Sequence, residues 1–287
     1  MTRNGSLVTA GIDVGSSAVK VAVLRSGGEG GETLLAGRCE RIRRRDPLEV
    51  ARAVFGEALA EAGLRRDDLA YTATTGEGEG VEFRTGHFYG MATHARGGLF
   101  LDPEARAVLD VGALHTRAIL MDSRAKVLGY RMTSQCASGS GQFLENICRY
   151  LGVTLEEIGP LSLRAADPEK CSSICAVLAE TDIINMVSRG IPVPDILKEI
   201  HQSMAGRYYR LLAGAGVRGR VLVTGGPAAD TGLLRALEEE AAANRSPLEI
   251  RSSPRSVLAG AIGAALWGTF RARRLAGRGL AGSGTRP

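Results

Sequence analysis

Apolar and polar residues alternate along the first hundred positions in a pattern that predicts an α/β unit. "LVTAGIDVG" and "SSAVKVAVLR", together residues 7–25, place apolar and β-branched residues on both sides of a Gly-Ser turn, which predicts two strands joined by a hairpin. Residues 46–63 carry apolar positions at helical spacing, with Asp46 as a candidate N-cap and Gly63 as a candidate stop. "LAYTATTGEGEG" predicts a strand that runs into a glycine loop.

The same pattern starts again at residue 105. "ARAVLDVGALHTRAILMDSRAKVLGYRM" predicts a strand that ends at Asp110, a turn at Gly112 and two further strands. "AGIDVGSSAVKVAVL" and "AVLDVGALHTRAILM" both place Asp-Val-Gly after an apolar strand and before a second strand. This weak internal repeat predicts two similar lobes.

The rest of the chain predicts mostly helices, with one apolar strand, "RVLVTGG", among them. The predicted helices span residues 140–151, 174–189, 195–213, 229–244 and 257–268. We therefore expect a first lobe at 1–104, completed by a C-terminal helix at 257–272, and a second lobe at 105–256. Residues 273–287 are expected to form a flexible tail.

Composition agrees with a soluble α/β protein. The chain has 287 residues, of which 44% are hydrophobic and 23% charged, and its 38 glycines suit the tight turns of nucleotide-binding folds. The net charge of +5 comes from scattered arginines, so we expect no nucleic-acid partner. Neither a signal peptide nor a membrane span is evident, which predicts a cytoplasmic protein with no membrane contact. Its five cysteines are then expected to be reduced.

The two Asp-x-Gly turns are candidate phosphate loops. Glycine allows a backbone N–H to approach phosphate oxygens, and a carboxylate at a strand end can hold Mg²⁺ through its waters. Asp13 and Asp110 are the candidate carboxylates. Asp-x-Gly is also common in ordinary hairpins, so each turn alone is weak evidence. Four further residues of these turns are candidate phosphate ligands: Gly15, Ser16, Ser17 and Gly112.

Two more features extend the candidate nucleotide site. Lys20 could supply a point charge for the β or γ phosphate. Gly225 and Gly226, after the strand "RVLVT", could pack against a ribose or adenine, although they could also form a simple strand-to-helix turn. No P-loop motif is present. The first Asp-x-Gly turn, the second Asp-x-Gly turn and the Gly-Gly pair follow one another along the chain. This order resembles that of the actin, heat-shock-protein and sugar-kinase superfamily, which implies two ribonuclease-H-like lobes around an ATP cleft.

Cys136 and Cys175 each lie at or near the start of a predicted helix. Backbone N–H groups and the helix dipole at such a position favour a thiolate, so both thiols suit metal binding. Cys39 and Cys148 have no matching context and are interpreted as small hydrophobic residues. A zinc site stays open as an alternative, with Cys171 and Cys175 as one pair and Cys136 and Cys148 as the other.

"SQCASGSGQFLENICRYLG" and "CSSICAVLAETDIINMVSRG" closely resemble the ATPase family of the 2-hydroxyacyl-CoA dehydratase activators and the ATP-binding subunits of class I benzoyl-CoA reductase. The resemblance covers about residues 8–270 and includes "TTGEG" and "THARGG". "CASGSGQFLENI" and "DVGALHTRAI" look most like the reductase branch. The resemblance implies that two cysteines per chain, matching Cys136 and Cys175, bind one [4Fe–4S] cluster shared with a second subunit, since such a cluster takes four thiolates.

One departure from the activators lies in the second phosphate loop. The activators have roughly Asp-Ile-Gly-Gly-Gln-Asp there, whereas this chain has Ala113, Leu114 and His115 after the glycine. The change could weaken ATP hydrolysis, or it could transfer the catalytic role to His115 or Glu180. Glu180 is therefore our third candidate catalytic residue. His94 and Asp182 are interpreted as structural, and we assign His94 no catalytic role.

The resemblance implies an ATP-driven electron-transfer subunit of benzoyl-CoA reductase. Its expected partners are a homologous ATPase subunit, the ring-reducing catalytic subunits and reduced ferredoxin, and its expected cofactors are ATP, Mg²⁺ and the shared cluster. A homodimeric activator of a 2-hydroxyacyl-CoA dehydratase is the alternative within the family. From other classes, a small-molecule kinase without a cluster and a nucleotide-gated zinc or regulatory protein remain open.

Overall fold

The chain folds into two compact units in the computed structural model, which describes residues 6–27, 31–133, 140–169 and 176–282. The first unit comprises Met1–Leu101 and Val257–Pro287, and the second comprises Asp102–Ser256. The chain thus passes from one unit to the other after Leu101 and returns after Ser256.

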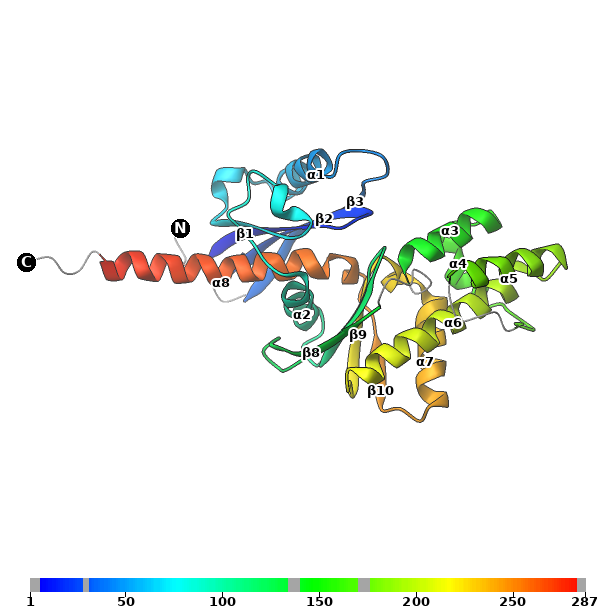
Figure 1. Ribbon diagram of the computed structural model, residues 1–287. Coiled ribbons are helices and arrows are strands. Elements are labelled where there is room, and N and C mark those ends of the chain that lie inside the picture. The colour runs from blue at the N-terminus through cyan, green and yellow to red at the C-terminus, as the bar shows by residue number, and fades with distance from the viewer. Residues whose placement is uncertain (1–5, 28–30, 134–139, 170–175, 283–287) are drawn as a thin grey trace, which may run out of the picture. The chain divides into compact units, whose positions relative to one another are not determined.

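The first unit is built on a five-stranded mixed sheet with the order β3-β2-β1-β4-β5. β1 pairs antiparallel with β2 and parallel with β4, so the hairpin lies on one side of β1 and the later strands on the other. Figure 1 labels the first three strands of this sheet. The elements are β1 (Leu7–Val14), β2 (Ala18–Ser26), β3 (Glu32–Arg41), α1 (Pro47–Glu61), β4 (Tyr71–Gly76), β5 (Gly86–His87), α2 (Gly90–Leu101) and α8 (Ala259–Gly282).

β2 shows how the sheet of the first unit is buried on both faces. Val19, Val21 and Val23 belong to the core that includes α1, whereas Ala22 and Leu24 belong to the core that includes α8. Successive side chains of a strand point to opposite faces, so a strand covered by helices on both sides is apolar almost throughout. This burial explains the continuous apolar run in the sequence of the strand.

Small residues let α8 lie very close to the sheet. A Cβ on Gly11 of β1 would collide with the backbone oxygen of Ala261. A Cβ on Gly97 of α2 would collide with the backbone oxygen of Ala259, and one on Gly263 with that of Thr93. Glycine at these positions is therefore a condition for the contact of α8 with both β1 and α2.

The second unit repeats the strand connectivity of the first. Its sheet order is β10-β9-β6-β7-β8, in which β6 pairs antiparallel with β7 and parallel with β9. The predicted recurrence of the hairpin is therefore confirmed. The elements are β6 (Ala107–Val111), β7 (Thr116–Met121), β8 (Val127–Met132), α3 (Gly141–Leu151), α4 (Leu155–Ser162), α5 (Ala176–Ser188), α6 (Val193–Gly214), β9 (Gly219–Gly225), α7 (Thr231–Ala243) and β10 (Leu248–Arg251).

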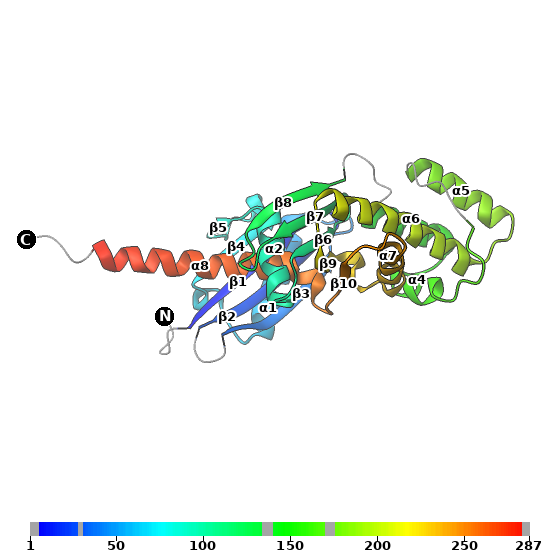
Figure 2. The same cartoon turned by 90° about the horizontal axis from the view of Figure 1, so that it is seen from below.

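Helices α3, α6 and α7 pack on one face of this sheet. Their buried residues form a single core with the inward-facing residues of β6 and β9. Figure 2 shows α4, α6 and α7 side by side, in agreement with the contacts among these helices. Tyr208 of α6 is fully buried in this core, and burial raises the pKa of its hydroxyl well above the usual range.

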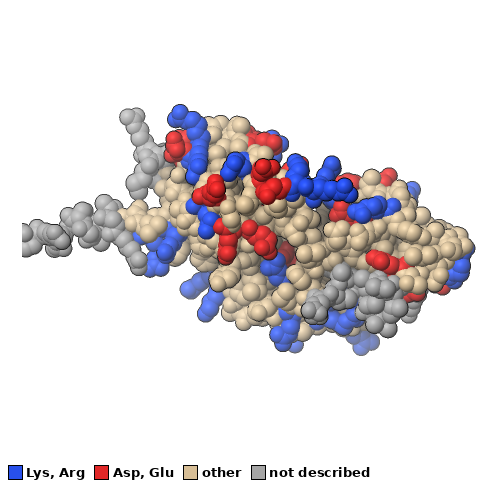
Figure 3. Space-filling model, turned by 45° about the horizontal axis from the view of Figure 1, so that its top comes forward, with Lys and Arg blue, Asp and Glu red and all other residues tan. Residues whose placement is uncertain are grey.

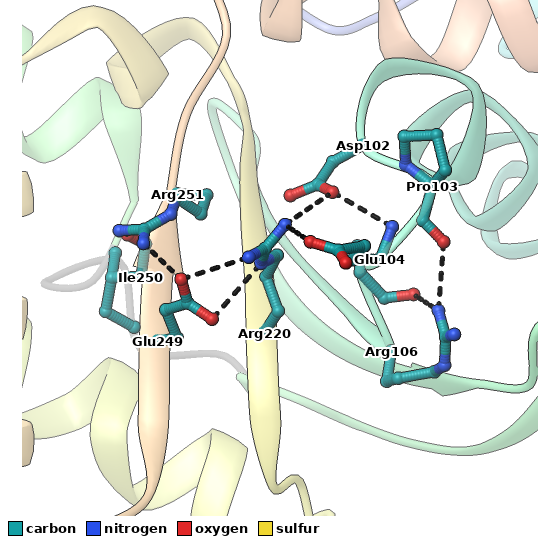
Figure 4. Close-up of polar contacts among 9 residues, drawn as sticks. Asp102, Pro103, Glu104, Arg106, Arg220, Glu249, Ile250 and Arg251 are labelled. Carbon is teal, nitrogen blue, oxygen red and sulfur yellow. Dashed lines mark hydrogen bonds and ion pairs between the residues drawn. The ribbon is translucent and has the colours of Figure 1, made fainter.

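Arg220 of β9 forms ion pairs both with the start of the second unit and with the neighbouring strand β10. The guanidinium donates to the carboxylate of Glu249 on β10 at 3.1 and 3.2 Å and lies 3.4 Å from Asp102, the first residue of the unit (Figure 4). It also pairs with Glu104. Hydrogen bonding to Glu249 and the nearby carboxylates raise the pKa of Arg220, which therefore keeps its charge.

Several elements differ from the sequence expectations. The last helix continues to Gly282, so the expectation of a flexible tail from residue 273 was wrong for the part of this segment that the structure describes. Arg, Ala and Leu, which fill residues 271–276, are strong helix formers and extend it. α6 begins at Val193 behind Pro192, two residues earlier than predicted. β3, β5, β10, α2 and α4 had no counterpart among the predicted elements.

Both signs of charge occur on the surface. Figure 3 shows Lys and Arg interspersed with Asp and Glu over the face drawn. Among the residues described, no helix combines the length and the apolar character needed to cross a membrane.

Candidate functional site

The first candidate phosphate loop is the turn between β1 and β2. Asp13 and Lys20 are directly opposite in the antiparallel pair, and Lys20 Nζ lies 3.4 Å from Asp13 Oδ2. Both side chains are mostly buried, with exposed fractions of 10% and 16%, so water screens this ion pair only partly. The hairpin register thus holds a cation beside a carboxylate at the end of β1.

Gly15 serves the loop mainly by leaving space. Its N–H donates to the Ala18 carbonyl at 3.0 Å and is used within the turn. A Cβ at Gly15 would lie 2.9 Å from Lys20 Nζ, which would displace the ammonium group. Ser16 is exposed and Ser17 partly buried, so the Ser16 hydroxyl faces solvent where a phosphate could approach.

The second candidate phosphate loop repeats this geometry between β6 and β7. Asp110 is paired in register with Arg117, and Arg117 Nε lies 3.4 Å from Asp110 Oδ2. The Gly112 N–H donates to the His115 carbonyl at 2.9 Å. The two hairpins therefore share a carboxylate, a glycine turn and an opposing cation, with arginine in the second where the first has lysine.

The parallel strands beside the hairpins end in equivalent glycines. Gly76 of β4 lies opposite Val14 with a φ of 66°, and Gly225 of β9 lies opposite Val111 with a φ of 90°. In each case a Cβ would collide with the carbonyl oxygen of the opposing valine. Both strands thus leave the sheet by a turn that only glycine can adopt without strain.

Gly226 differs from Gly225 in having open space around it. No atom lies within 4 Å of the position that its Cβ would take, and its φ is outside the left-handed range. The turn continues as a short 3₁₀ helix, Gly226–Ala229, into α7. The bare backbone at Gly226 is suited to contact with a flat ring.

The start of α7 is held by a buried polar cluster. Asp230 caps the helix, accepting from the N–H groups of Gly232 and Leu233 at 3.0 and 3.1 Å. His201 Nε2 lies 3.0 Å from the second Asp230 oxygen, without the alignment of a hydrogen bond, and His201 Nδ1 lies 2.9 Å from Ser162 Oγ. Sequence analysis missed this cluster, because its members come from α4, α6 and α7.

Of the remaining candidates, Glu180, Asp182 and His94 lie outside the two hairpins, whereas Leu114 and His115 belong to the second one. Glu180 and Asp182 are on α5, one of the helices between β8 and β9. Leu114 and His115 are exposed in the turn after Gly112. His94 is on α2 and is only 7% exposed. The proposed catalytic role of Glu180 stays a prediction.

The candidate metal ligands Cys136 and Cys175 lie outside the described residues, as does Cys171. Cys136 precedes Ser140, the N-cap of α3, by four positions, and Cys175 immediately precedes Ala176, the first residue of α5. The part of the chain with known placement holds no group of three or more metal-binding side chains. Cys148 is buried, and burial raises its pKa to about 11, which disfavours a thiolate.

Two units with one strand connectivity, each with an Asp–cation hairpin, define the actin-like and sugar-kinase-like class of folds. The glucokinase of Streptomyces griseus shares this fold, with a TM-score of 0.55 at 14% identity over 92% of this chain and 99% of its own. The model of the BadF/BadG/BcrA/BcrD ATPase family matches residues 10–268. The chain belongs to this family.

Two relatives within the family are similar along most of their length. The D subunit of benzoyl-CoA reductase from Thauera aromatica is 59% identical over 270 residues, which are 94% of this chain and 95% of that protein. The activator of the 2-hydroxyisocaproyl-CoA dehydratase from Clostridium difficile, solved with bound ADPNP, superposes with a TM-score of 0.86 at 29% identity, over 95% of this chain and 98% of its own.

Proposed function

We propose that this chain is an ATP-binding, electron-transfer subunit of a benzoyl-CoA reductase and couples ATP hydrolysis to the delivery of low-potential electrons. The 59% identity to the reductase subunit of Thauera aromatica, over nearly the whole of both chains, is the observation that carries the proposal. The substrate chemistry is assigned to separate ring-reducing subunits. Reduced ferredoxin is the proposed donor, and the complex is placed in the cytoplasm, where thiols stay reduced.

The hairpin geometry supports MgATP as the nucleotide. Asp13 and Asp110 are carboxylates of the kind that hold Mg²⁺ through its waters, and Lys20 supplies a positive charge beside the first loop. The space that Gly15 leaves for Lys20 would be filled by any larger residue. Gly225 and Gly226 would contact the nucleoside, and Ser16, Ser17 and Gly112 would contact phosphates.

The order of the sequence supports an iron–sulfur cluster. Cys136 and Cys175 precede α3 and α5 along the chain, and a thiolate close to a helix N-terminus would be favoured by the helix dipole. The buried Cys148, with its raised pKa, is an unsuitable competitor. When bound, the cluster would supply one-electron redox chemistry. Two thiols per chain leave it incomplete, so a homologous ATPase subunit would supply the other two.

Coupling would run through the helices that follow these cysteines along the chain. ATP binding and hydrolysis would bias the equilibrium between two arrangements of the units, as a ligand does when it binds one state more tightly. Movement of α3 and α5 would change the environment of the thiolates and the docking of the acceptor subunit.

Metal analysis of anaerobically purified protein tests the proposal. We expect about two iron atoms and two acid-labile sulfides per chain, since one four-iron cluster serves two chains. Cys136→Ser and Cys175→Ser should lose both, while Cys39→Ser, at an exposed position of β3, should retain them. Absence of iron from the wild type, together with full ATPase activity of Cys136→Ala, would exclude the electron-transfer role.

Copurification separates the proposal from the activator alternative. The activating ATPases in the family are about half as identical to this chain as the reductase subunit, with 31% for that of Acidaminococcus fermentans. A stable complex with a different but related ATPase subunit would favour the reductase. A homodimer that already contains a complete cluster would favour an activator of a 2-hydroxyacyl-CoA dehydratase.

A further inference from the structure

Two glycines lie against the carboxylate of Asp13, and a third lies against the ammonium group of Lys20. A Cβ at Gly76 would lie 3.0 Å from Asp13 Oδ1, and one at Gly260 would lie 2.8 Å from Asp13 Oδ2. A Cβ at Gly15 would lie 2.9 Å from Nζ of Lys20, the partner of this carboxylate. These residues come from the turn after β1, the end of β4 and the start of α8. The surroundings of Asp13 are therefore built by segments far apart in the sequence.

The imidazole of His94 shares the space over Gly260 with Asp13. The Cβ position of Gly260 is 2.8 Å from His94 Nε2, as it is from Asp13 Oδ2. The two polar atoms therefore both border one point that glycine leaves open. Both residues are 7% exposed, so few water molecules can compete for either atom.

The backbone of α2 next to His94 is held on two sides. The preceding residue, Thr93, has its hydroxyl 3.1 Å from that of Thr75, which is paired with Asp13 across β1 and β4. On the side facing α8, a Cβ at Gly263 would collide with the Thr93 carbonyl. The part of α2 that carries His94 is thus held by the strand next to Asp13 and by the helix that carries Gly260.

We propose that His94 is a positioning residue for Asp13, holding the carboxylate from the side of Oδ2 so that Asp13 can orient the Mg²⁺ of bound nucleotide. A neutral imidazole can donate one N–H, which Nε2 would direct toward the carboxylate. A buried carboxylate with donors on fixed sides has one preferred orientation, and an oriented carboxylate holds a hydrated Mg²⁺ without reorganisation. This inference rests on the proposed role of the chain as an MgATP-dependent protein.

Replacements at His94 that keep or remove the Nε2 donor test the inference. His94→Gln places an amide N–H near the Nε2 position, His94→Asn near the Nδ1 position, and His94→Leu places none. His87→Gln is the matched control, since His87 bonds to Thr74 and lies near Glu79 rather than Asp13. For each protein, ADP binding is measured by calorimetry with Mg²⁺ and with EDTA, and thermal unfolding is followed in parallel.

We expect His94→Leu to bind Mg²⁺·ADP at least about tenfold more weakly than the wild type, the effect of losing a hydrogen bond to a charged group. Its affinity for ADP in EDTA should be unchanged. His94→Gln should stay within about threefold of the wild type, His94→Asn should behave like His94→Leu, and His87→Gln should match the wild type.

Any of four results would overturn the inference. Equal losses in all three His94 variants, or equal losses with and without Mg²⁺, would assign His94 to packing alone. Wild-type affinity in His94→Leu would remove any role beside Asp13, and the proposed function would stand. Failure of the wild type to bind ADP more tightly with Mg²⁺ would overturn the proposed nucleotide site together with this inference.

Discussion

Lys20 lies directly across the first hairpin from Asp13, with its ammonium nitrogen 3.4 Å from the carboxylate. The ion pair is mostly buried and stands at the end of β1, where the chain turns through Gly15. Asp110 and Arg117 repeat the arrangement in the second unit. An arginine is larger and presents several donors in a plane, whereas a lysine is a compact point charge. The two loops are therefore expected to serve different parts of the nucleotide.

Removal of the lysine charge should weaken nucleotide binding. We expect Lys20→Ala to lower the affinity for MgATP by about tenfold or more, because it removes a charge-assisted contact with the phosphates and the ion pair with Asp13. Calorimetric titration with a non-hydrolysable ATP analogue measures the loss. Lys126→Ala, at an exposed position in the turn before β8, should bind like the wild type. Equal affinity in Lys20→Ala and the wild type would exclude a phosphate contact.

The two glycines after β9 should respond differently to alanine. Gly225→Ala forces a residue with a Cβ into a φ of 90° and against the Val111 carbonyl, so we expect a loss of roughly 1–3 kcal/mol in the free energy of unfolding. Gly226→Ala meets open space and should unfold like the wild type. Denaturant titration of both variants measures the difference.

Gly226→Ala also reports on the nucleoside. Since the methyl group leaves the fold unchanged, a weaker affinity for adenosine nucleotides in this variant would arise from contact with the ligand itself. Unchanged affinity would show that the nucleoside does not bind at Gly226.

Cys148 should make stability depend on pH in the alkaline range. Burial raises its pKa from an ordinary value near 9 to about 11, so the folded state holds the thiol proton more tightly than the unfolded state. This contribution is complete below pH 9 and is lost as the pH rises through 11. Unfolding of the wild type and Cys148→Ala is compared from pH 8 to about 11.

The difference between the two proteins isolates the thiol, because Tyr208, whose pKa is also raised by burial, is present in both. We expect the free energy of unfolding to fall more steeply with pH in the wild type than in Cys148→Ala. Parallel curves would show that the thiol titrates normally in the fold.

The hairpins could be predicted because their signals are local. Apolar strands flank an Asp-Val-Gly turn in both units, and Asp46 caps α1 as its sequence context indicates. α2 was missed because glycines such as Gly97 and Gly98 are poor helix formers. Gly97 is present for another reason, since a larger residue would collide with the backbone of α8. Tertiary packing overrode local propensity in this helix.

The candidate site was predicted only in part for a similar reason. Asp13 and Lys20 are seven positions apart and meet through a hairpin register that the pattern implies. Gly260 of α8 packs against the same carboxylate, and His94 of α2 lies beside that glycine. Contacts over such separations depend on how the helices cover the sheet, and one sequence carries no direct record of that packing.

Insertions between equivalent strands distinguish the two halves of the chain. In the first unit, residues 42–70 connect the third strand to the fourth and contain α1. In the second unit, residues 133–218 make the same connection and contain α3 to α6, together with four of the five cysteines. The two units thus share their strand connectivity and the Asp–cation hairpin and differ most in this connection, which is also where the cysteines of the chain are concentrated.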